Sequence, residues 1–212
     1  MSWQYYGTKT LQVVPYMPGT PVYRDVMLPH LFFSLKKEEK IAETFCGENK
    51  NLDDFVTYFN RIKTMQVLCR VKENLDLDPV GMSWVDLPRG VNGARACQCG
   101  MAFFGDAART PDAQSLSRMS LAYAFEEMKI DVFHGVQLAS NLKARNFSMK
   151  LGFRECARVP RWHYMEENGS GGLVDARVMI LDKSDFMPEF EKWHAAQERP
   201  KQKAVEAEKS LG

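Results

Sequence analysis

Alternating and helix-spaced apolar residues predict a strand and then helices in the first third of the chain. Leu11–Pro15 lies in a loosely alternating segment, which favours a first strand. Between Val26 and Lys50 an apolar patch precedes a charged run, a pattern typical of one or two helices. From Asn51 to Lys63 the apolar residues recur at helical spacing, and Asn51 itself is a candidate N-cap.

A meander of three strands is predicted next. The strands occupy Met65–Lys72, Pro79–Leu87 and Ala94–Phe104, which are rich in apolar residues with partial alternation. Pro88–Gly93 contains a proline and two glycines and is expected to be a turn. Gly100 lies inside the third strand, and a glycine there indicates a bulge or a close backbone approach.

The order of elements changes in the second half of the chain. The predicted elements are a helix at Pro111–Met128, a strand at Asp131–Leu138, a short helix at Leu142–Leu151, and strands at Phe153–Trp162 and Leu173–Leu181 joined by a hairpin loop at Glu166–Gly172. A short amphipathic helix is expected at Pro188–Gln197, followed by a polar tail from Glu198 that is expected to be frayed or disordered. This order predicts an α/β protein with a mixed sheet.

The short helix has well-marked ends within Ser140–Phe153, which reads SNLKARNFSMKLGF. Asn141 suits the N-cap position, because its side chain accepts a hydrogen bond from an amide of the first turn. Gly152 stands where the helix must stop, since glycine takes the left-handed C-cap conformation without strain. A strand then begins at Phe153.

Composition narrows the classes of function. With 212 residues, of which 45% are hydrophobic, the chain is able to form one large domain or one domain with extensions. Its net charge of +1 gives no global field that attracts nucleic acid, and no apolar run reaches the roughly 18 residues of a membrane-spanning helix. The first residues do not resemble a signal peptide, and the five cysteines lack metal or redox spacing. A cytoplasmic protein without nucleic-acid or membrane partners is therefore expected.

Ser140–Phe153 resembles the penultimate helix of the GNAT (general N-acetyltransferase) fold, with its pattern N-x-x-A-x-x-x-x-x-K-L-G-F. Together with Tyr123–Glu127 (YAFEE), it is most similar to the branch that acetylates protein N-termini and related amines. The resemblance implies a GNAT-like mixed, mostly antiparallel central sheet flanked by helices. It implies one domain over residues 1–186 with its core at 65–183, in which residues 1–64 supply the first strand and the acceptor-side helices. Residues 187–212 would form a C-terminal helix and tail.

The same resemblance implies that acetyl-coenzyme A (acetyl-CoA) is a substrate, bound beside the third strand. The family holds the pyrophosphate in a loop at the start of its long helix, which corresponds here to Ala108–Ala113. Asn141 is expected to contact the pantetheine arm as well as to cap its helix. The positions that the resemblance assigns to the coenzyme are Phe103, Phe104, Arg109, Thr110, Ala113 and Asn141.

The loop departs from the family pattern (Q/R)-x-x-G-x-(G/A). Ala108 stands where Gln or Arg is usual, and Pro111, which has no N–H, stands at the glycine position. The same residues also make a plain helix start, with Thr110 as N-cap, Pro111 at the first helical position and Asp112 at the positive end of the helix dipole. Arg109 is the residue able to clamp a phosphate. The sequence leaves the choice between a coenzyme loop and a capped helix start open.

Transfer from a thioester needs a proton donor for the leaving thiolate and a base for the attacking amine. The donor position of the family falls at Ser148, where many members carry a tyrosine. The candidate bases are Asp106, Asp86, His134 and His163. The pKa of a histidine suits proton transfer near neutral pH, although histidine is also a common structural residue.

Two classes of function follow from these residues. The first is an acetyl-CoA-dependent N-acetyltransferase that acts by direct transfer on a protein N-terminus, a lysine or a small amine. The second is a GNAT-fold protein that has lost or changed coenzyme use and acts by binding, for example as a bacteriophage virion or assembly component with an assembly partner. The altered loop and the additional terminal segments agree with either class.

Overall fold

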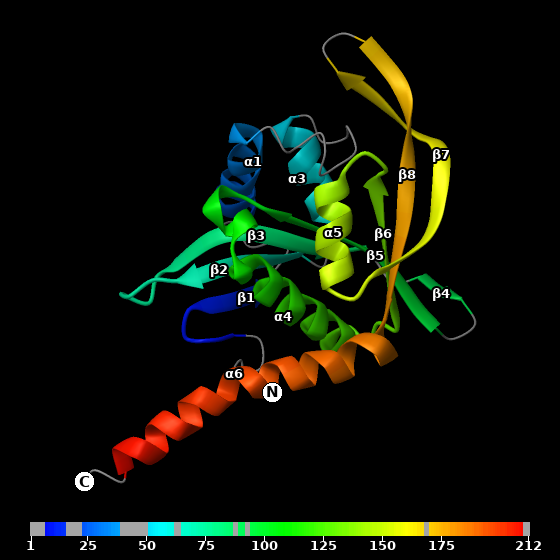
Figure 1. Cartoon of the computed structure of the whole chain (residues 1–212). Helices are drawn as coiled ribbons and strands as arrows, with labels where there is room; N and C mark the ends of the chain where they lie inside the picture. Colours follow the sequence, from blue (N-terminus) through cyan, green and yellow to red (C-terminus); the bar gives the residue numbers. More distant parts are fainter. Residues whose placement is uncertain are drawn as a thin grey trace.

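A single sheet with helices on both faces organises the chain in its computed structural model (Figure 1). The structure describes residues 7–15, 23–38, 51–61, 65–86, 89–91, 94–167 and 170–209. Within these residues, no helix is both long enough and apolar enough to cross a lipid bilayer.

The strands follow the order β1-β2-β3-β5-β6-β8-β7 across the sheet. Their bounds are β1 Leu11–Pro15, β2 Met65–Val71, β3 Leu77–Val85, β5 Ala94–Phe103, β6 Val132–Leu138, β7 Arg154–Glu167 and β8 Ser170–Asp182. Neighbouring strands are antiparallel except β5 and β6, which run parallel. A short strand, β4 (Arg89–Val91), pairs with β5 outside this order. The prediction of a mixed, mostly antiparallel sheet is confirmed.

Helices connect the strands where the apolar spacing predicts them. Their bounds are α1 Leu28–Lys37, α3 Leu52–Arg61, α4 Pro111–Glu127, α5 Leu142–Lys150 and α6 Lys183–Lys209, with a π-helical turn at Tyr23–Met27 before α1 and a 3₁₀ turn at Gly105–Arg109 before α4. Asn51 caps α3, since its Oδ1 accepts a hydrogen bond from the amide of Asp54 at 2.9 Å. Gly152 ends α5 with a φ of +99°, in agreement with the predicted left-handed C-cap.

Helices α4, α5 and α6 share the hydrophobic core on one face of the sheet. The ring centroid of Phe125 in α4 lies 4.5 Å from that of Phe133 in β6 and 5.4 Å from that of Phe186 in α6. All three rings are fully or nearly fully buried, and burial of one such side chain is worth about 1.5–3 kcal/mol. This contact fixes α4 against β6, and α4 begins at one end of the site described below.

Helices α1 and α3 cover the opposite face with a second core. Phe55 of α3 packs against Phe32 of α1, with 5.4 Å between ring centroids. Phe59, one turn further along α3, lies edge-on to the indole of Trp84 in β3 at 5.7 Å. The N-terminal helices are thereby fixed over β3 and β5.

Three segments differ from the sequence-based expectations. Arg89–Val91, expected in a turn, forms β4, because an edge strand needs backbone pairing but no apolar pattern. The hairpin strands β7 and β8 continue to Glu167 and Ser170, deep into the segment expected as loop, again through backbone pairing. Helix α6 begins at Lys183, because Phe186 and Phe190 both enter the core, and its backbone stays helical past Glu198 to Lys209. Residues 39–50 and 62–63, which belong to two of the predicted helices, lie outside the described residues.

Candidate functional site

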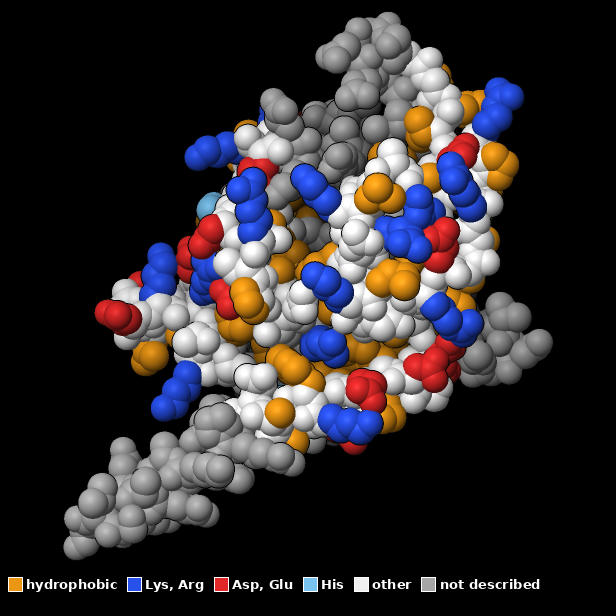
Figure 2. Space-filling view, viewed as in Figure 1, with side chains coloured by type: hydrophobic (Ala, Val, Ile, Leu, Met, Phe, Trp, Pro, Cys, Tyr) orange, Lys and Arg blue, Asp and Glu red, His pale blue; other side chains and the backbone are white. Residues whose placement is uncertain are grey.

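A cleft opens where the parallel strands β5 and β6 separate. The two strands pair only from Ala96–Gln98 to Val132–His134, and beyond these residues they diverge. A cleft of about 940 Å³ follows this divergence. That volume lies at the upper end of the roughly 300–1,000 Å³ that is typical of ligand pockets. Figure 2 shows hydrophobic side chains inside the hollow on this face and basic side chains around it.

The edge of β5 presents backbone groups to the cleft. In an antiparallel strand, successive residues direct their N–H and C=O groups to opposite sides. Phe104 donates its amide to Val80 on the β3 side, whereas the carbonyl of Arg95 accepts from Asp131 on the β6 side. The odd-numbered residues of β5 therefore face β6, and beyond the last pair Met101 directs its N–H and C=O toward the cleft.

Helix α5 supplies one wall of the cleft. Asn141 caps it, since its Oδ1 accepts a hydrogen bond from the amide of Ala144 at 2.9 Å. Ser148 lies two turns further on and accepts a hydrogen bond at 2.6 Å from Nε2 of Gln137 in β6. This bond leaves the hydroxyl proton of Ser148 for another acceptor. Oε1 of Gln137 is buried, and no described residue donates a hydrogen bond to it.

Basic and acidic side chains line different parts of the cleft. The basic ones are Arg109, which precedes α4, and Lys143 and Lys150 of α5, and all three are exposed. Among the described lining residues, Asp86 is the acidic one, and it follows the end of β3. An anionic ligand is favoured near the three cations and a cationic one near Asp86.

Aromatic side chains line the same region as Asp86. Trp84 belongs to the core on the α1 and α3 face, and Tyr58 of α3 packs against that core. Asp86 lies two residues beyond Trp84, so strand alternation places it on the same face. Trp162 of β7 also lines the cleft and is half exposed. The cleft is thus basic beside α4 and α5, and aromatic and acidic on the opposite face.

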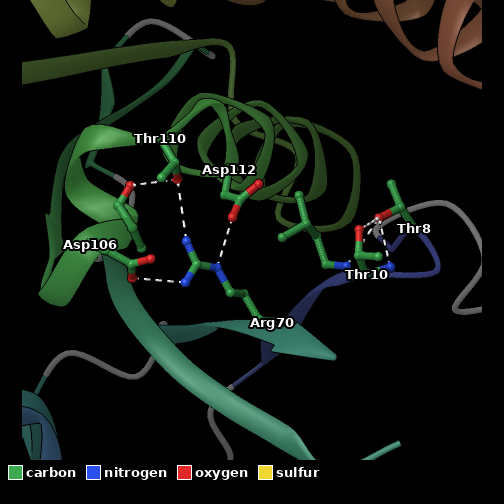
Figure 3. Close-up of polar contacts among 8 residues, drawn as sticks. Thr8, Thr10, Arg70, Asp106, Thr110 and Asp112 are labelled. Atoms are coloured by element: carbon green, nitrogen blue, oxygen red, sulfur yellow. Dashed lines mark hydrogen bonds and ion pairs between the residues drawn. The ribbon is translucent and has the colours of Figure 1, made fainter. Parts of the chain in front are cut away.

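Arg70 of β2 joins the 3₁₀ turn to the first turn of α4 (Figure 3). Its guanidinium binds Asp106 and Asp112, each at 2.8 Å, and donates to Thr110 Oγ1 at 3.4 Å. The hydroxyl of Thr110 donates to the carbonyl of Ala107 at 3.1 Å and makes no capping bond, so Thr110 occupies the N-cap position without the predicted side-chain cap. Pro111 does begin the helix. Arg70 fixes this turn from a strand about 40 residues earlier.

The structure brings some of the predicted site residues together and separates others. The predicted residues that line the cleft are Phe103, Arg109, Thr110, Asn141 and Ser148. Phe104 and Ala113 are buried on opposite faces of the sheet, and His134 lies in the paired part of β6. The carboxylate of Asp106 is directed to Arg70, outside the set of lining residues.

Replacement of Arg70 by methionine is expected to lower the free energy of unfolding by about 1–2 kcal/mol, because charge-assisted hydrogen bonds to two carboxylates are lost. Urea denaturation measures this loss. The matched control is Lys72→Met, which removes an exposed pair to Asp78 at 3.7 Å and should cost less than about 0.5 kcal/mol. An Arg70 variant as stable as the control would contradict this role.

The same pair predicts the behaviour in acid. The hydrogen bond from Arg70 holds the pKa of Asp106 below its ordinary value of 3.8. A lowered folded pKa means that the stabilisation is present above the unfolded pKa and is lost as the pH falls through the folded one. The stability difference between the wild type and Arg70→Met should therefore shrink below about pH 4. If the stability difference between the wild type and Arg70→Met stays constant from pH 7 to 2.5, the ion pair between Arg70 and Asp106 does not stabilise the fold.

Cys99 also lines the cleft but is a poor nucleophile. Burial raises the pKa of its thiol to about 12, so the thiol stays protonated at neutral pH. Because the thiolate is the reactive form of cysteine, a covalent intermediate on Cys99 is disfavoured.

Solved structures of other proteins share the fold of this chain. No family model matches the sequence, and no curated protein matches it either. Among solved structures, spermidine N-acetyltransferase from Vibrio cholerae in complex with CoA and spermine has a TM-score of 0.64 and 14% identity, over 85% of this chain and 99% of that chain. A GNAT-family acetyltransferase from Bacillus anthracis has a TM-score of 0.57 and 15% identity, over 82% and 95% respectively. The chain therefore has the fold of the GNAT N-acetyltransferases, as the Asn141–Phe153 pattern predicts.

Proposed function

We propose that the protein is an N-acetyltransferase that moves the acetyl group of acetyl-CoA directly to an amine. The observation that carries the proposal is the cleft between β5 and β6, basic beside α4 and α5 and acidic on the opposite face. An anionic donor and an amine acceptor would meet in such a cleft from opposite faces of the sheet. The solved neighbour that contains both CoA and spermine has the same fold, which supports the choice.

The basic end suits the phosphate groups of the coenzyme. Arg109, Lys143 and Lys150 are exposed cations able to bind phosphate oxygens, and the start of α4 adds the positive end of its dipole. Arg70 neutralises Asp112 in the first turn of α4, which reduces its repulsion of a phosphate. The buried Oε1 of Gln137 would accept a hydrogen bond from an amide of the pantetheine arm.

The reacting groups follow from the same geometry. The amine nitrogen attacks the thioester carbonyl carbon, a C–N bond forms and the C–S bond breaks. The N–H of Met101 stabilises the oxyanion that develops on the carbonyl oxygen. Asp86 accepts the proton that the amine loses, and the hydroxyl of Ser148 donates a hydrogen bond to the leaving thiolate, which then takes a proton from solvent. Asp106 and His134, which do not line the cleft, have no part in this scheme.

Isothermal titration calorimetry with acetyl-CoA tests whether the coenzyme binds, which acetyl transfer requires. Binding at micromolar concentration or tighter supports the proposal. Absence of binding at millimolar acetyl-CoA would remove it and leave the GNAT-fold binding protein as the remaining candidate. The titration is made on the full chain, with acetyl phosphate as a ligand that shares the acyl group but lacks the coenzyme.

The proposed roles of Asp86 and Ser148 predict separable kinetic effects. Asp86→Asn is expected to lower kcat by about 100-fold, and Ser148→Ala by about tenfold, because the first loses a base and the second a hydrogen bond. Neither change should alter the Kd for acetyl-CoA more than about twofold. Release of free CoA thiol measures kcat, and calorimetry measures Kd. Asp78→Asn is the matched control. Asp78 belongs to β3, the strand that Asp86 follows, and does not line the cleft.

A further inference from the structure

Strand β7 contains a bulge beside the cleft. Val159 pairs with Ala176 and His163 pairs with Val174, so three residues of β7 lie opposite the single residue Asp175 of β8. Arg161, in the middle of the three, has a φ of +54°. A residue other than glycine rarely adopts this left-handed conformation, and such strain persists where the surroundings impose it.

Asp175 holds the bulge through both carboxylate oxygens. Its Oδ1 accepts a hydrogen bond from the backbone N–H of Arg161 at 3.1 Å, and its Oδ2 accepts one from Nη2 of Arg158 at 3.0 Å. Both hydrogen bonds keep the pKa of Asp175 below its ordinary value. The bond from the backbone N–H of Arg161 has the larger effect, and the bond from the guanidinium of Arg158 the smaller. The carboxylate is therefore ionised at neutral pH, and the bulge is held on both sides.

The bulge determines where the next residue, Trp162, lies. A bulge bends its strand and changes the direction of the side chains within it, and Trp162 is the last of the three residues that lie opposite Asp175. Trp162 lines the cleft with its indole half exposed. The same cleft is lined by Tyr58 from α3 and by Trp84 and Asp86 from the end of β3.

We propose that Tyr58, Trp84, Asp86 and Trp162 form an acceptor subsite for a primary alkylammonium group, and that the bulge held by Asp175 positions Trp162 in it. This inference rests on the proposed function, since it names the class of acceptor. Aromatic faces attract a cation through their negative π surface, and a carboxylate adds direct charge attraction. The subsite binds the ammonium form. Asp86 takes its first proton and releases it to solvent before the nitrogen attacks, and Asp86 then accepts the second proton as the C–N bond forms.

Nuclear magnetic resonance of the indole N–H groups tests the subsite without any coenzyme. The chain has four tryptophans, so four indole signals can be assigned by single Trp→Phe changes. Titration with n-butylamine at neutral pH should shift the signals of Trp84 and Trp162. It should leave Trp193, which packs against Phe190 in α6, unchanged. n-Butanol, a neutral ligand of the same length, should bind at least about tenfold more weakly.

Two changes at one position test the bulge. Arg161→Gly should keep the amine affinity within about twofold, because glycine adopts a positive φ without strain. Arg161→Val should weaken it about fivefold or more, since a β-branched residue resists that conformation. Equal affinity of the two variants, or equal binding of n-butylamine and n-butanol, would overturn the proposal.

Two sources of the alkylammonium group are distinguished by the choice of ligand. Tighter binding of Nα-acetyllysine methylamide than of n-butylamine points to a lysine side chain of a peptide, and the reverse points to a free amine. Either result supports the subsite. These titrations contain no acetyl-CoA, so a failure of the subsite and a failure of coenzyme binding are observed separately.

Discussion

Replacement of Gly100 by alanine is expected to destabilise the protein by about 2–3 kcal/mol and to displace the indole of Trp84. Gly100 of β5 lies opposite Trp84 of β3 in the antiparallel pair, and the indole lies directly over the glycine. A Cβ at Gly100 would overlap the six-membered ring of Trp84 more closely than real contacts allow. The ring is almost fully buried and contacts Phe59, so it has little room to move.

Thermal denaturation measures the stability of the Gly100 variant, and near-ultraviolet circular dichroism reports the indole. A loss of 2–3 kcal/mol corresponds to a fall in Tm of about 4–12 °C for a chain of this size. Gly172→Ala is the matched control, because no atom lies within 4 Å of a Cβ at that position. In a Trp84→Ala background the Gly100→Ala change should cost less than about 0.5 kcal/mol, since its clash is gone. An equal cost in both backgrounds would contradict the packing described.

Replacement of Arg109, Lys143 and Lys150 together by glutamine is expected to weaken acetyl-CoA binding by about 100-fold. Each exposed cation is expected to contribute about 1 kcal/mol to phosphate binding, and a total of about 3 kcal/mol corresponds to a factor of roughly 100 to 200. The effect should be smaller in 1 M salt, because the Debye length falls to about 3 Å. Calorimetry at two salt concentrations measures both effects.

A second triple variant controls for the loss of net charge. Lys72, Lys129 and Lys192 are exposed, and none of them lines the cleft. Their joint replacement by glutamine removes the same charge and should change the affinity by less than about threefold. If both triple variants lose affinity equally, the coenzyme does not bind at the basic end of the cleft.

Local signals in the sequence predict most of the fold. The caps at Asn51, Asn141 and Gly152 depend on residues within a few positions, so the sequence alone identifies them. Strand β4 and the long β7–β8 hairpin depend on pairing between backbones, which leaves no apolar pattern to recognise. The glycine at Gly100 predicts a bulge or a close backbone approach, whereas the structure shows a regular register with the side chain of Trp84 packed on the glycine.

The site is harder to predict, because its contacts join distant parts of the chain. Arg70 reaches Asp106 and Asp112 over 36 and 42 residues, and no spacing in the sequence connects them. Gln137 carries no motif, and its contact with Ser148 depends on how α5 returns across β6. Family resemblance places Arg109, Asn141 and Ser148 along the chain, and folding brings them into one cleft.

The most direct test of the proposed acetyl transfer is the formation of an acetylated amine. The wild-type chain is incubated with acetyl-CoA labelled with ¹³C in its acetyl group and with n-butylamine, and the products are followed by mass spectrometry. We expect labelled N-acetylbutylamine and free CoA in equal amounts, with a rate about 100-fold lower for Asp86→Asn. Acetyl-CoA that remains intact in the presence of millimolar amine and of a peptide with a free lysine and a free N-terminus would contradict the proposed acetyl transfer.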